Sequence, residues 1–404
     1  MPTRRTRYAP WVWIASVLGA AFLLPLFAFA QSNPTAPADT AQTQTATAPE
    51  KPVLYWHGIT LNGFASAAYT YNTNQPRPEF NQFRTFDFED NTFKLDIAEA
   101  VVQKAVSKPR DWGFRADVTG GESVPKVAAS YGMFRDKCSG KAGHLDIHQL
   151  FASYVVPVGK GLRVDAGKFV THFGYEVIEG YDGYNDNYSR SFLFGYGIPF
   201  THTGIKASYP VTSKVGVTAM VVNGWDDVHD NNRSRSIGAQ LAITPTKSTA
   251  TYVNYMGGAE AAANNHSLRQ AFNVVQTWSA TPKLSVAGDF LFAHEDDILG
   301  PEKSAIWAAF AGYARYSVSS QFSMSFRGEV FRDSDGVRTG KAQTLTGFTI
   351  TPEYRRTVNL GRLPTRFVFR GDFRCDHSSV PVFVTETQLR QHQVTLAVNL
   401  IYAF

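Results

Sequence analysis

The sequence predicts an all-β protein, a transmembrane antiparallel β-barrel of about 16 strands. Three observations lead to this fold class. The final segment, residues 389–404, alternates apolar with polar or small side chains and finishes on the aromatic Phe404. Similar segments recur along the chain, and the connections between them are alternately short and long. The mean hydropathy of the 404 residues is −0.20, as expected when one face of each strand meets water.

The N-terminal residues 1–30 predict a cleaved signal peptide. Three arginines precede an apolar run over residues 11–27, and Ala28-Phe29-Ala30 supplies a small-residue cleavage site. An uncleaved membrane anchor is the alternative, but the rest of the chain requires export. Residues 31–55 are rich in Pro, Thr, Ala and Gln and are expected to form a disordered periplasmic lead-in. Residues 56–404 then form the barrel.

Charge and cysteine content exclude several classes of function. The chain has 39 basic and 34 acidic residues, and loss of three arginines with the signal peptide leaves 36 − 34 = +2. A chain this close to neutrality gives no reason to expect nucleic acid as a partner. Cys138 and Cys375 could form a disulfide after export, or remain two isolated thiols. The sequence has no zinc-ligand spacing, phosphate loop or complete calcium loop, so we expect no metal and no cofactor.

Each alternating segment is long enough for a tilted strand that crosses a bilayer in ~9–11 residues. No apolar run after residue 30 reaches the ~20 residues that a spanning helix needs. The predicted strands are 58–71, 91–104, 111–120, 144–157, 161–171, 201–210, 214–224, 234–244, 248–258, 267–280, 282–294, 304–317, 320–332, 342–356, 364–377 and 389–404.

The connections between these strands support a barrel rather than a soluble sandwich. Short turns such as 158–160 alternate with longer polar loops such as 121–143 and 172–199. Only the link around 357–363 is slightly long for a short turn. Short periplasmic turns opposite long outer loops are typical of bacterial outer-membrane barrels. An even strand count would place both ends of the barrel on the periplasmic side.

Charged residues fall on the inward face when the apolar face of each strand is assigned to lipid. Arg-x-Asp or Arg-x-Glu recurs on four of these faces, and an Arg on the lipid face would cost ~2–4 kcal/mol at the bilayer midplane. These residues could select solutes by charge, or they could simply neutralise one another along the wall. The predicted pore-lining residues are Arg115, Asp117, Arg163, Asp165, Lys206, Asp289, Arg327, Glu329, Arg366, Arg370, Asp372 and Arg374.

The long loop 172–199 is a second candidate site because it is rich in aromatic residues. These rings are too many to leave in water, and we expect the loop to fold into the barrel and constrict it. Packing over the rim or against a neighbouring subunit is the alternative. Tyr181, Tyr184 and Tyr188 would form the constriction, and Arg190 would meet the solute.

Several short motifs, in order along the chain, resemble the OmpL-like beta-barrel porin-2 family. The resemblance covers nearly the whole mature chain and implies an outer-membrane channel of a Gram-negative bacterium. The motifs are Gly167-Lys168-Phe169, Gly174-Tyr175-Glu176, Asn187 to Ser191, Pro199 with His202-Thr203-Gly204, Val222 to Asp226, Arg327-Gly328-Glu329 with Asp333 to Gly340, Thr349 to Tyr354, and Arg370 through Asp376-His377-Ser378.

From these features we expect a porin, not an enzyme, that lets small hydrophilic solutes diffuse passively and weakly prefers anions. Expected partners are outer-membrane lipid, lipopolysaccharide and the barrel-assembly machinery, which would engage the closing strand with Tyr402 and Phe404. A homotrimer is compatible with a barrel of this size. The alternatives are a structural or adhesin barrel with a closed lumen and a barrel lipid hydrolase. For a hydrolase, His377 and Ser378 would point to opposite faces of one strand, which is poor geometry for catalysis.

Overall fold

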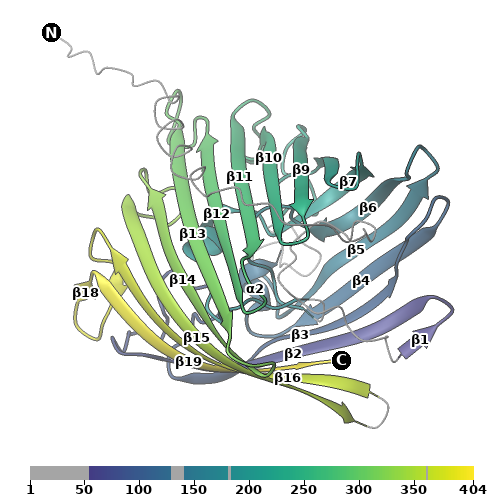
Figure 1. Cartoon of the computed structure of the whole chain (residues 1–404). Coiled ribbons are helices and arrows are strands. Elements are labelled where there is room, and N and C mark those ends of the chain that lie inside the picture. The colour runs from purple at the N-terminus through teal and green to yellow at the C-terminus, as the bar shows by residue number, and fades with distance from the viewer. Residues whose placement is uncertain (1–53, 129–140, 181–182, 361–362) are drawn as a thin grey trace. The chain divides into compact units, whose positions relative to one another are not determined.

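The computed structural model describes residues 54–128, 141–180, 183–360 and 363–404. All of its strands except β17 and β18 form one antiparallel sheet that closes when β19 pairs with β2 (Figure 1). The 17-stranded sheet includes the short β1 (Leu54–Trp56), which pairs with the start of β2, so the closed barrel has 16 strands. They are β2 (Ile59–Asn72), β3 (Thr92–Lys104), β4 (Trp112–Gly120), β5 (Leu145–Val156), β6 (Leu162–Val170), β7 (Thr201–Pro210), β8 (Val215–Val222), β9 (Ser236–Thr246), β10 (Thr249–Ala259), β11 (Leu268–Ser279), β12 (Leu284–Glu295), β13 (Ala305–Ser317), β14 (Phe322–Asp333), β15 (Gln343–Leu360), β16 (Leu363–Ser378) and β19 (His392–Ala403).

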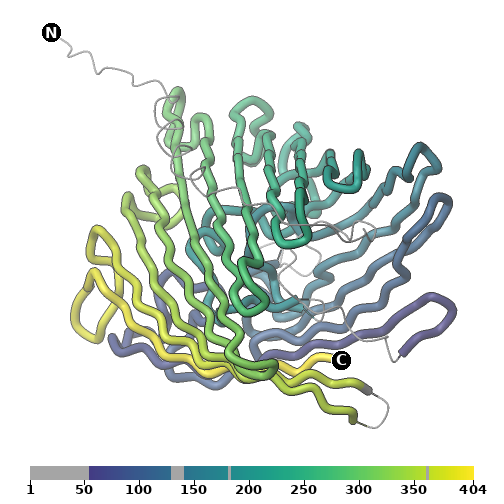
Figure 2. Tube along the Cα trace, in the orientation of Figure 1, coloured from purple at the N-terminus to yellow at the C-terminus, as the bar shows by residue number. Residues whose placement is uncertain are grey.

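The predicted fold class is confirmed, and most strand ends lie within two residues of their predicted positions. The link predicted around 357–363 is wrong in extent, because 357–360 continue β15 and pair with β16. The last predicted strand also starts too early. Its first residues form β18 (Leu389–Arg390), which pairs with β17 (Phe383–Val384) rather than with the barrel. Consecutive strands run side by side along the trace in Figure 2.

The sequence did not predict the short elements within the loops. These are α2 (Val124–Val127) and the π-helical turn η1 (Leu193–Gly197). Among the described residues, no helix is long and apolar enough to cross a membrane. The predicted signal peptide and most of the lead-in lie outside the described residues, and β1 begins at Leu54 near the end of the predicted lead-in.

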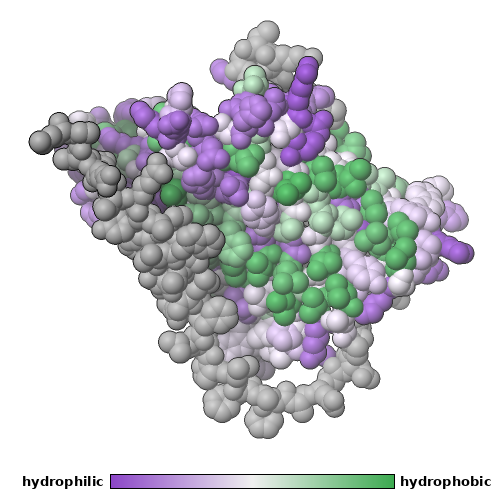
Figure 3. All heavy atoms as spheres, turned by 90° about the horizontal axis from the view of Figure 1, so that it is seen from above, coloured by the Kyte–Doolittle hydropathy of each residue, from purple (hydrophilic) through white to green (hydrophobic). Residues whose placement is uncertain are grey.

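The two faces of the wall have opposite character because side chains alternate along each strand. Large apolar residues point outward and remain exposed, for example Phe93 at 82% and Val398 at 58%. The view in Figure 3 shows apolar side chains gathered across the middle of one face, with polar residues along its upper edge. An apolar outer band is what a barrel surrounded by lipid requires.

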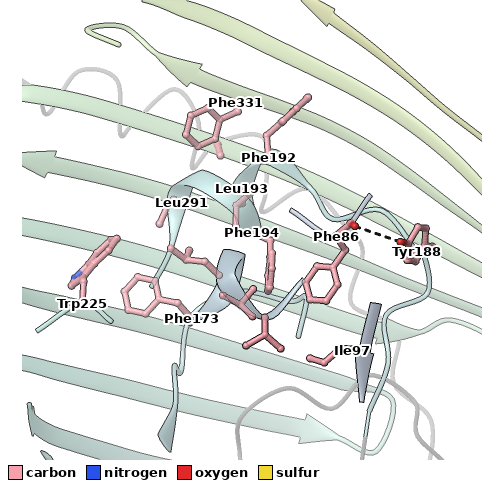
Figure 4. Packing of buried hydrophobic residues seen from close by; sticks show 14 of the residues in the cluster. Phe86, Ile97, Phe173, Tyr188, Phe192, Leu193, Phe194, Trp225, Leu291 and Phe331 are labelled. Atoms are coloured by element: carbon pink, nitrogen blue, oxygen red, sulfur yellow. Dashed lines mark hydrogen bonds between the residues drawn. The ribbon is translucent and has the colours of Figure 1, made fainter. Parts of the chain in front are cut away.

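The inward face carries an apolar core together with buried polar residues. Inward side chains such as Phe169, Leu291 and Phe331 pack with residues from the loops, including Phe86 and Phe194 (Figure 4). The interior near these loops is therefore filled by side chains rather than lined only by charges.

Two glycines let strand β6 approach β5 closely and strand β7 approach β8 closely. Gly167 and Gly204 are partners across the β6–β7 pair, and both belong to the motifs noted in the sequence. Gly167 has φ 138°, and a Cβ there would lie 2.2 Å from the backbone oxygen of Leu150. A Cβ on Gly204 would lie 2.2 Å from the backbone oxygen of Val221. Only glycine fits such close backbone contacts.

The C-terminal residue takes part in closing the barrel. The Phe404 backbone donates to the Gly63 oxygen at 2.9 Å and accepts from the Gly63 nitrogen at 3.0 Å. Its ring lies 5.8 Å from that of Tyr402. The predicted closing strand, with Tyr402 and Phe404 at its end, is therefore paired with the first barrel strand.

Deleting Phe404 is expected to lower the free energy of unfolding by about 1–3 kcal/mol, because two backbone hydrogen bonds are lost. Urea unfolding in lipid vesicles, followed by tryptophan fluorescence, measures this change. The Phe404→Leu variant serves as the control, since it keeps both backbone bonds. A deletion variant as stable as the wild type would contradict the expectation.

Candidate functional site

The segment between β6 and β7, residues 172–199 and here called the inner segment, packs against the inward face of the barrel. Its backbone binds polar side chains of two neighbouring strands. The Gly174 nitrogen donates to Asn273 Oδ1 at 3.1 Å, and the Tyr175 nitrogen donates to Asp289 Oδ2 at 2.8 Å. Further along, η1 contacts β12, β13 and β14. The segment is thus attached to the wall at several points, not extended from the rim.

Three wall arginines hold the middle of the inner segment by its backbone. Arg327 on β14 donates to the Ser189 oxygen at 2.5 Å, and Arg370 on β16 donates to the Asn185 oxygen at 2.5 Å. Arg374, four residues further along β16 on the same face, donates to the Arg190 oxygen. Because a guanidinium has five donors, each arginine can bind a carbonyl and an acid together.

Ion pairs strengthen the same attachment. Arg327 lies 2.8 Å from Glu176, and Arg370 lies 2.8 Å from Glu179, so each pairs with an acid of the inner segment. These charges are buried, and removing one partner of a buried ion pair typically costs 3–5 kcal/mol. The arrangement therefore fixes the segment strongly to β14 and β16.

Wall acids accept hydrogen bonds from the segment in return. Glu329 accepts from the Phe192 nitrogen at 2.5 Å, and Asp372 accepts from the Tyr188 nitrogen at 3.0 Å. Asp372 also accepts from the Ser189 hydroxyl at 2.9 Å. Carboxylates satisfy backbone donors that would otherwise be buried without partners.

Aromatic side chains of the inner segment fill the space next to these polar contacts. Phe192 and Phe194 are buried in the apolar core, and the Tyr188 hydroxyl lies 3.5 Å from the Phe86 oxygen (Figure 4). Burial raises the pKa of Tyr188 well above its ordinary value, and it raises the pKa of Tyr196 to about 12. These phenols therefore stay protonated and add no negative charge to the lumen near neutral pH.

The predicted constriction residues lie in different surroundings. Tyr184 is partly exposed, and the Arg370 guanidinium sits 5.5 Å from the centre of its ring. The sequence analysis predicted that Arg190 meets the solute, and this prediction is wrong because Arg190 is buried. It stacks 4.1 Å from the Phe86 ring and lies 3.5 Å from Glu179. Tyr181 lies outside the described residues.

Eight of the predicted pore-lining residues are at most 7% exposed, and six of these eight contact the inner segment. These six face inward, yet they meet protein instead of water, because a loop distant in sequence occupies that part of the interior. The six residues are Asp289, Arg327, Glu329, Arg370, Asp372 and Arg374.

The remaining predicted residues lie toward the short turns, where the cations are more exposed than the acids. Arg163 pairs with Asp165 at 2.8 Å and Lys206 lies 3.5 Å from the same carboxylate. Their side chains are 22% and 18% exposed, whereas that of Asp165 is 1% exposed. Arg115 and Asp117 repeat this pattern at 2.8 Å. The accessible surface here is therefore mainly positive.

Sequence reasoning missed Arg315 and Glu353, which also face inward. Arg315 on β13 lies 2.7 Å from Glu353 on β15 and also pairs with Asp186 of the inner segment. The alternation of side chains along the predicted strands 304–317 and 342–356 could have identified them. It places each residue on the polar face of its own strand.

The structure also locates the His377–Ser378 pair and one of the two cysteines considered in the sequence analysis. His377 is exposed and stacks on His392 with ring centroids 4.6 Å apart, while Ser378 is buried and donates to Gln343 at 2.8 Å. They thus face opposite sides of the wall. Cys375 is a partly exposed free thiol, and Cys138 lies outside the described residues.

Comparison with known proteins agrees with the closed barrel. The family model described as "Putative beta-barrel porin-2, OmpL-like" matches residues 58–404. No curated protein matches the sequence.

Solved structures with the same fold share little sequence. The anion-selective porin from Comamonas acidovorans has a TM-score of 0.54 and 10% identity, over 86% of this chain and 99% of that one. OprB of Pseudomonas putida has a TM-score of 0.58 and 11% identity, over 86% and 94%. The trimer form of OmpT of Vibrio cholerae has a TM-score of 0.53 and 11% identity, over 86% and 99%. At these identities the similarity shows the fold alone.

Proposed function

The chain belongs to the OmpL-like putative beta-barrel porin-2 family and is an outer-membrane channel, and on that premise we propose that its inner segment forms the narrow part of the diffusion path. The observation that carries this proposal is the attachment of the segment to β14 and β16 by Arg327, Arg370 and Arg374. Because the segment is fixed to the inward face at three points, it reduces the open cross-section of the barrel. This narrowing does not require contacts with the outer loops.

Small hydrophilic solutes would pass the inner segment along the part of the wall that it leaves uncovered. There the inward face is polar, with Arg163 on β6 and Lys206 on β7, which both pair with Asp165. Exposed cations above buried carboxylates favour anions weakly over cations. The similar Comamonas porin is described as anion-selective, which is consistent with this preference.

A barrel with a closed lumen is the second candidate, and the apolar core inside the wall favours it. Phe86, Phe192 and Phe331 belong to one buried cluster that joins two loops to β14. If the same cluster continued across the whole interior, the barrel would serve as a structural or adhesive element.

Liposome swelling separates these two candidates. We expect vesicles that contain the purified protein to swell in pentose and hexose solutions and to swell more slowly in disaccharides, because the inner segment limits size. A folded barrel that gives no swelling with any sugar would overturn the porin proposal and support the closed lumen. Release of free fatty acid by hydrolysis of the phospholipids in the same vesicles would instead reveal a lipid hydrolase.

Partners of the channel follow from its surface. The apolar outer band would contact outer-membrane lipid and lipopolysaccharide, and Tyr402 and Phe404 on the closing strand would engage the barrel-assembly machinery. We also propose a homotrimer, since a trimer form is described for the similar Vibrio cholerae protein. Cross-linking in native membranes followed by denaturing electrophoresis tests this assembly.

A further inference from the structure

A group of three arginines lies on the inward face of β13, β15 and β16, toward the short turns. Arg315 and Arg355 both contact the same oxygen of Glu353, at 2.7 Å and 2.8 Å. Arg315 also pairs with Asp186 of the inner segment. The acids near this group are therefore already engaged with two of the three guanidinium groups.

Arg366, the third arginine, has no such partner. Alternation along β16 places it on the inward face with Arg370, and its side chain is partly exposed. Among the described residues, no hydrogen bond or ion pair engages its guanidinium. The other inward arginines on the strands, from Arg115 to Arg374, each pair with an acid. Arg366 is thus an unneutralised cation inside the barrel.

The register brings Arg355 and Arg366 close together. Arg355 is the partner of Val368 and Arg366 is the partner of Thr357, so the two arginines are diagonal neighbours on adjacent strands. Diagonal residues on one face lie about 7–8 Å apart, within reach of long side chains. The Arg355 side chain is 30% exposed, so both guanidinium groups are accessible from the lumen.

Two accessible guanidinium groups at this spacing suit an anion with several oxygens on one centre. A guanidinium presents a planar fork of donors that matches carboxylate and phosphate oxygens, and such charge-assisted bonds are about twice as strong as neutral ones. The three arginines outnumber the two acids that pair with them, Glu353 and Asp186, so a bound anion would also relieve repulsion between like charges.

We infer that Arg355 and Arg366 form a binding subsite for a small carboxylate or phosphate anion at the short-turn end of the lumen. The inference rests on the proposed function, because the anion must reach the lumen. It adds a specific binding step to a path that otherwise selects by size and weak overall charge.

Single-channel recording of the full chain in planar bilayers tests the subsite. With chloride as the carrier, phosphate or succinate is added separately to each side of the membrane. We expect a saturable reduction of the wild-type current by at least one of these anions. Arg366→Gln should raise the half-blocking concentration about tenfold, the effect of losing one charge-assisted contact.

Two further variants make this result decisive. Lys283→Gln removes a cation from an exposed turn at the same end of the barrel and should block like the wild type. Arg366→Lys keeps the charge but loses the fork, so its half-blocking concentration should lie between those of the wild type and R366Q. If R366Q inserts poorly into the bilayer, an increase in the half-blocking concentration of R366K over the wild type tests the subsite instead.

The outcomes distinguish the subsite from the channel itself. Block by phosphate alone or by succinate alone supports the subsite and identifies its ligand, and block by both supports the shared chemistry. A conducting wild type that neither anion blocks, or equal block of R366Q and the wild type, overturns the subsite only. A wild type that never conducts contradicts the proposed function and the subsite together.

Discussion

Single channels of the Arg370→Ala variant are expected to show higher and noisier conductance than those of the wild type. Arg370 holds the inner segment through the Asn185 oxygen and Glu179, and it also donates to Asn399 on β19. Its loss leaves the buried Glu179 without this partner, at a typical cost of 3–5 kcal/mol. A segment released by that amount would spend part of its time away from the wall.

The Arg269→Ala variant is the matched control for this prediction. Arg269 also faces inward and forms a two-point ion pair, but its partner Glu295 belongs to the neighbouring strand rather than to the inner segment. Its removal should leave the conductance close to that of the wild type. Equal conductance of the wild type and R370A would show that Arg370 does not control the width of the path.

The Gly167→Ala variant is expected to lose a large part of the stability of the barrel. An Ala side chain there would meet the Leu150 backbone oxygen at 2.2 Å, and the residue would keep φ 138°. Overpacking and a strained backbone cost about 1–3 kcal/mol each, or roughly 2–6 kcal/mol together. Urea unfolding in vesicles measures the loss.

Gly328 provides a control in the same kind of strand. A Cβ on Gly328 would have no atom within 4 Å, and its φ is not positive. The Gly328→Ala variant should therefore unfold at nearly the same urea concentration as the wild type. If G167A were as stable as G328A, the close approach of β6 to β5 would not matter for stability.

The wall of the barrel could be predicted because each strand carries its own signal. A period of two identifies a strand and its two faces without knowledge of its partner, and turn length then orders the strands. The same pattern offered neutralising pairs two residues apart along the wall as one of its two interpretations. Arg163 and Asp165 lie at 2.8 Å, and Arg327 and Glu329 at 3.2 Å.

What occupies the interior could not be predicted in the same way. Alternation shows that Arg370 faces inward, but it cannot show that Glu179, far away in sequence, will pair with it. Asp372, on the same face of the same strand, accepts hydrogen bonds from the Tyr188 nitrogen and the Ser189 hydroxyl of the inner segment. Such contacts depend on how a long loop folds back, for which no local period exists.

Arg190 shows the same limit from the side of the loop. A single cation among many aromatic residues suggested a group that meets solute, yet it packs against Phe86 and Glu179 in the protein interior. The aromatic content of the inner segment did indicate that the segment is packed rather than solvated. It did not indicate which of its residues would remain at the surface.

Planar-bilayer recording of the wild-type chain tests the central claim most directly, that a closed wall encloses a continuous aqueous path beside the inner segment. The expected result is stepwise, ohmic current. In a salt gradient, its reversal potential should shift modestly toward the equilibrium potential of the anion. A chain with the circular dichroism of a folded β-barrel that inserts but carries no current would contradict it.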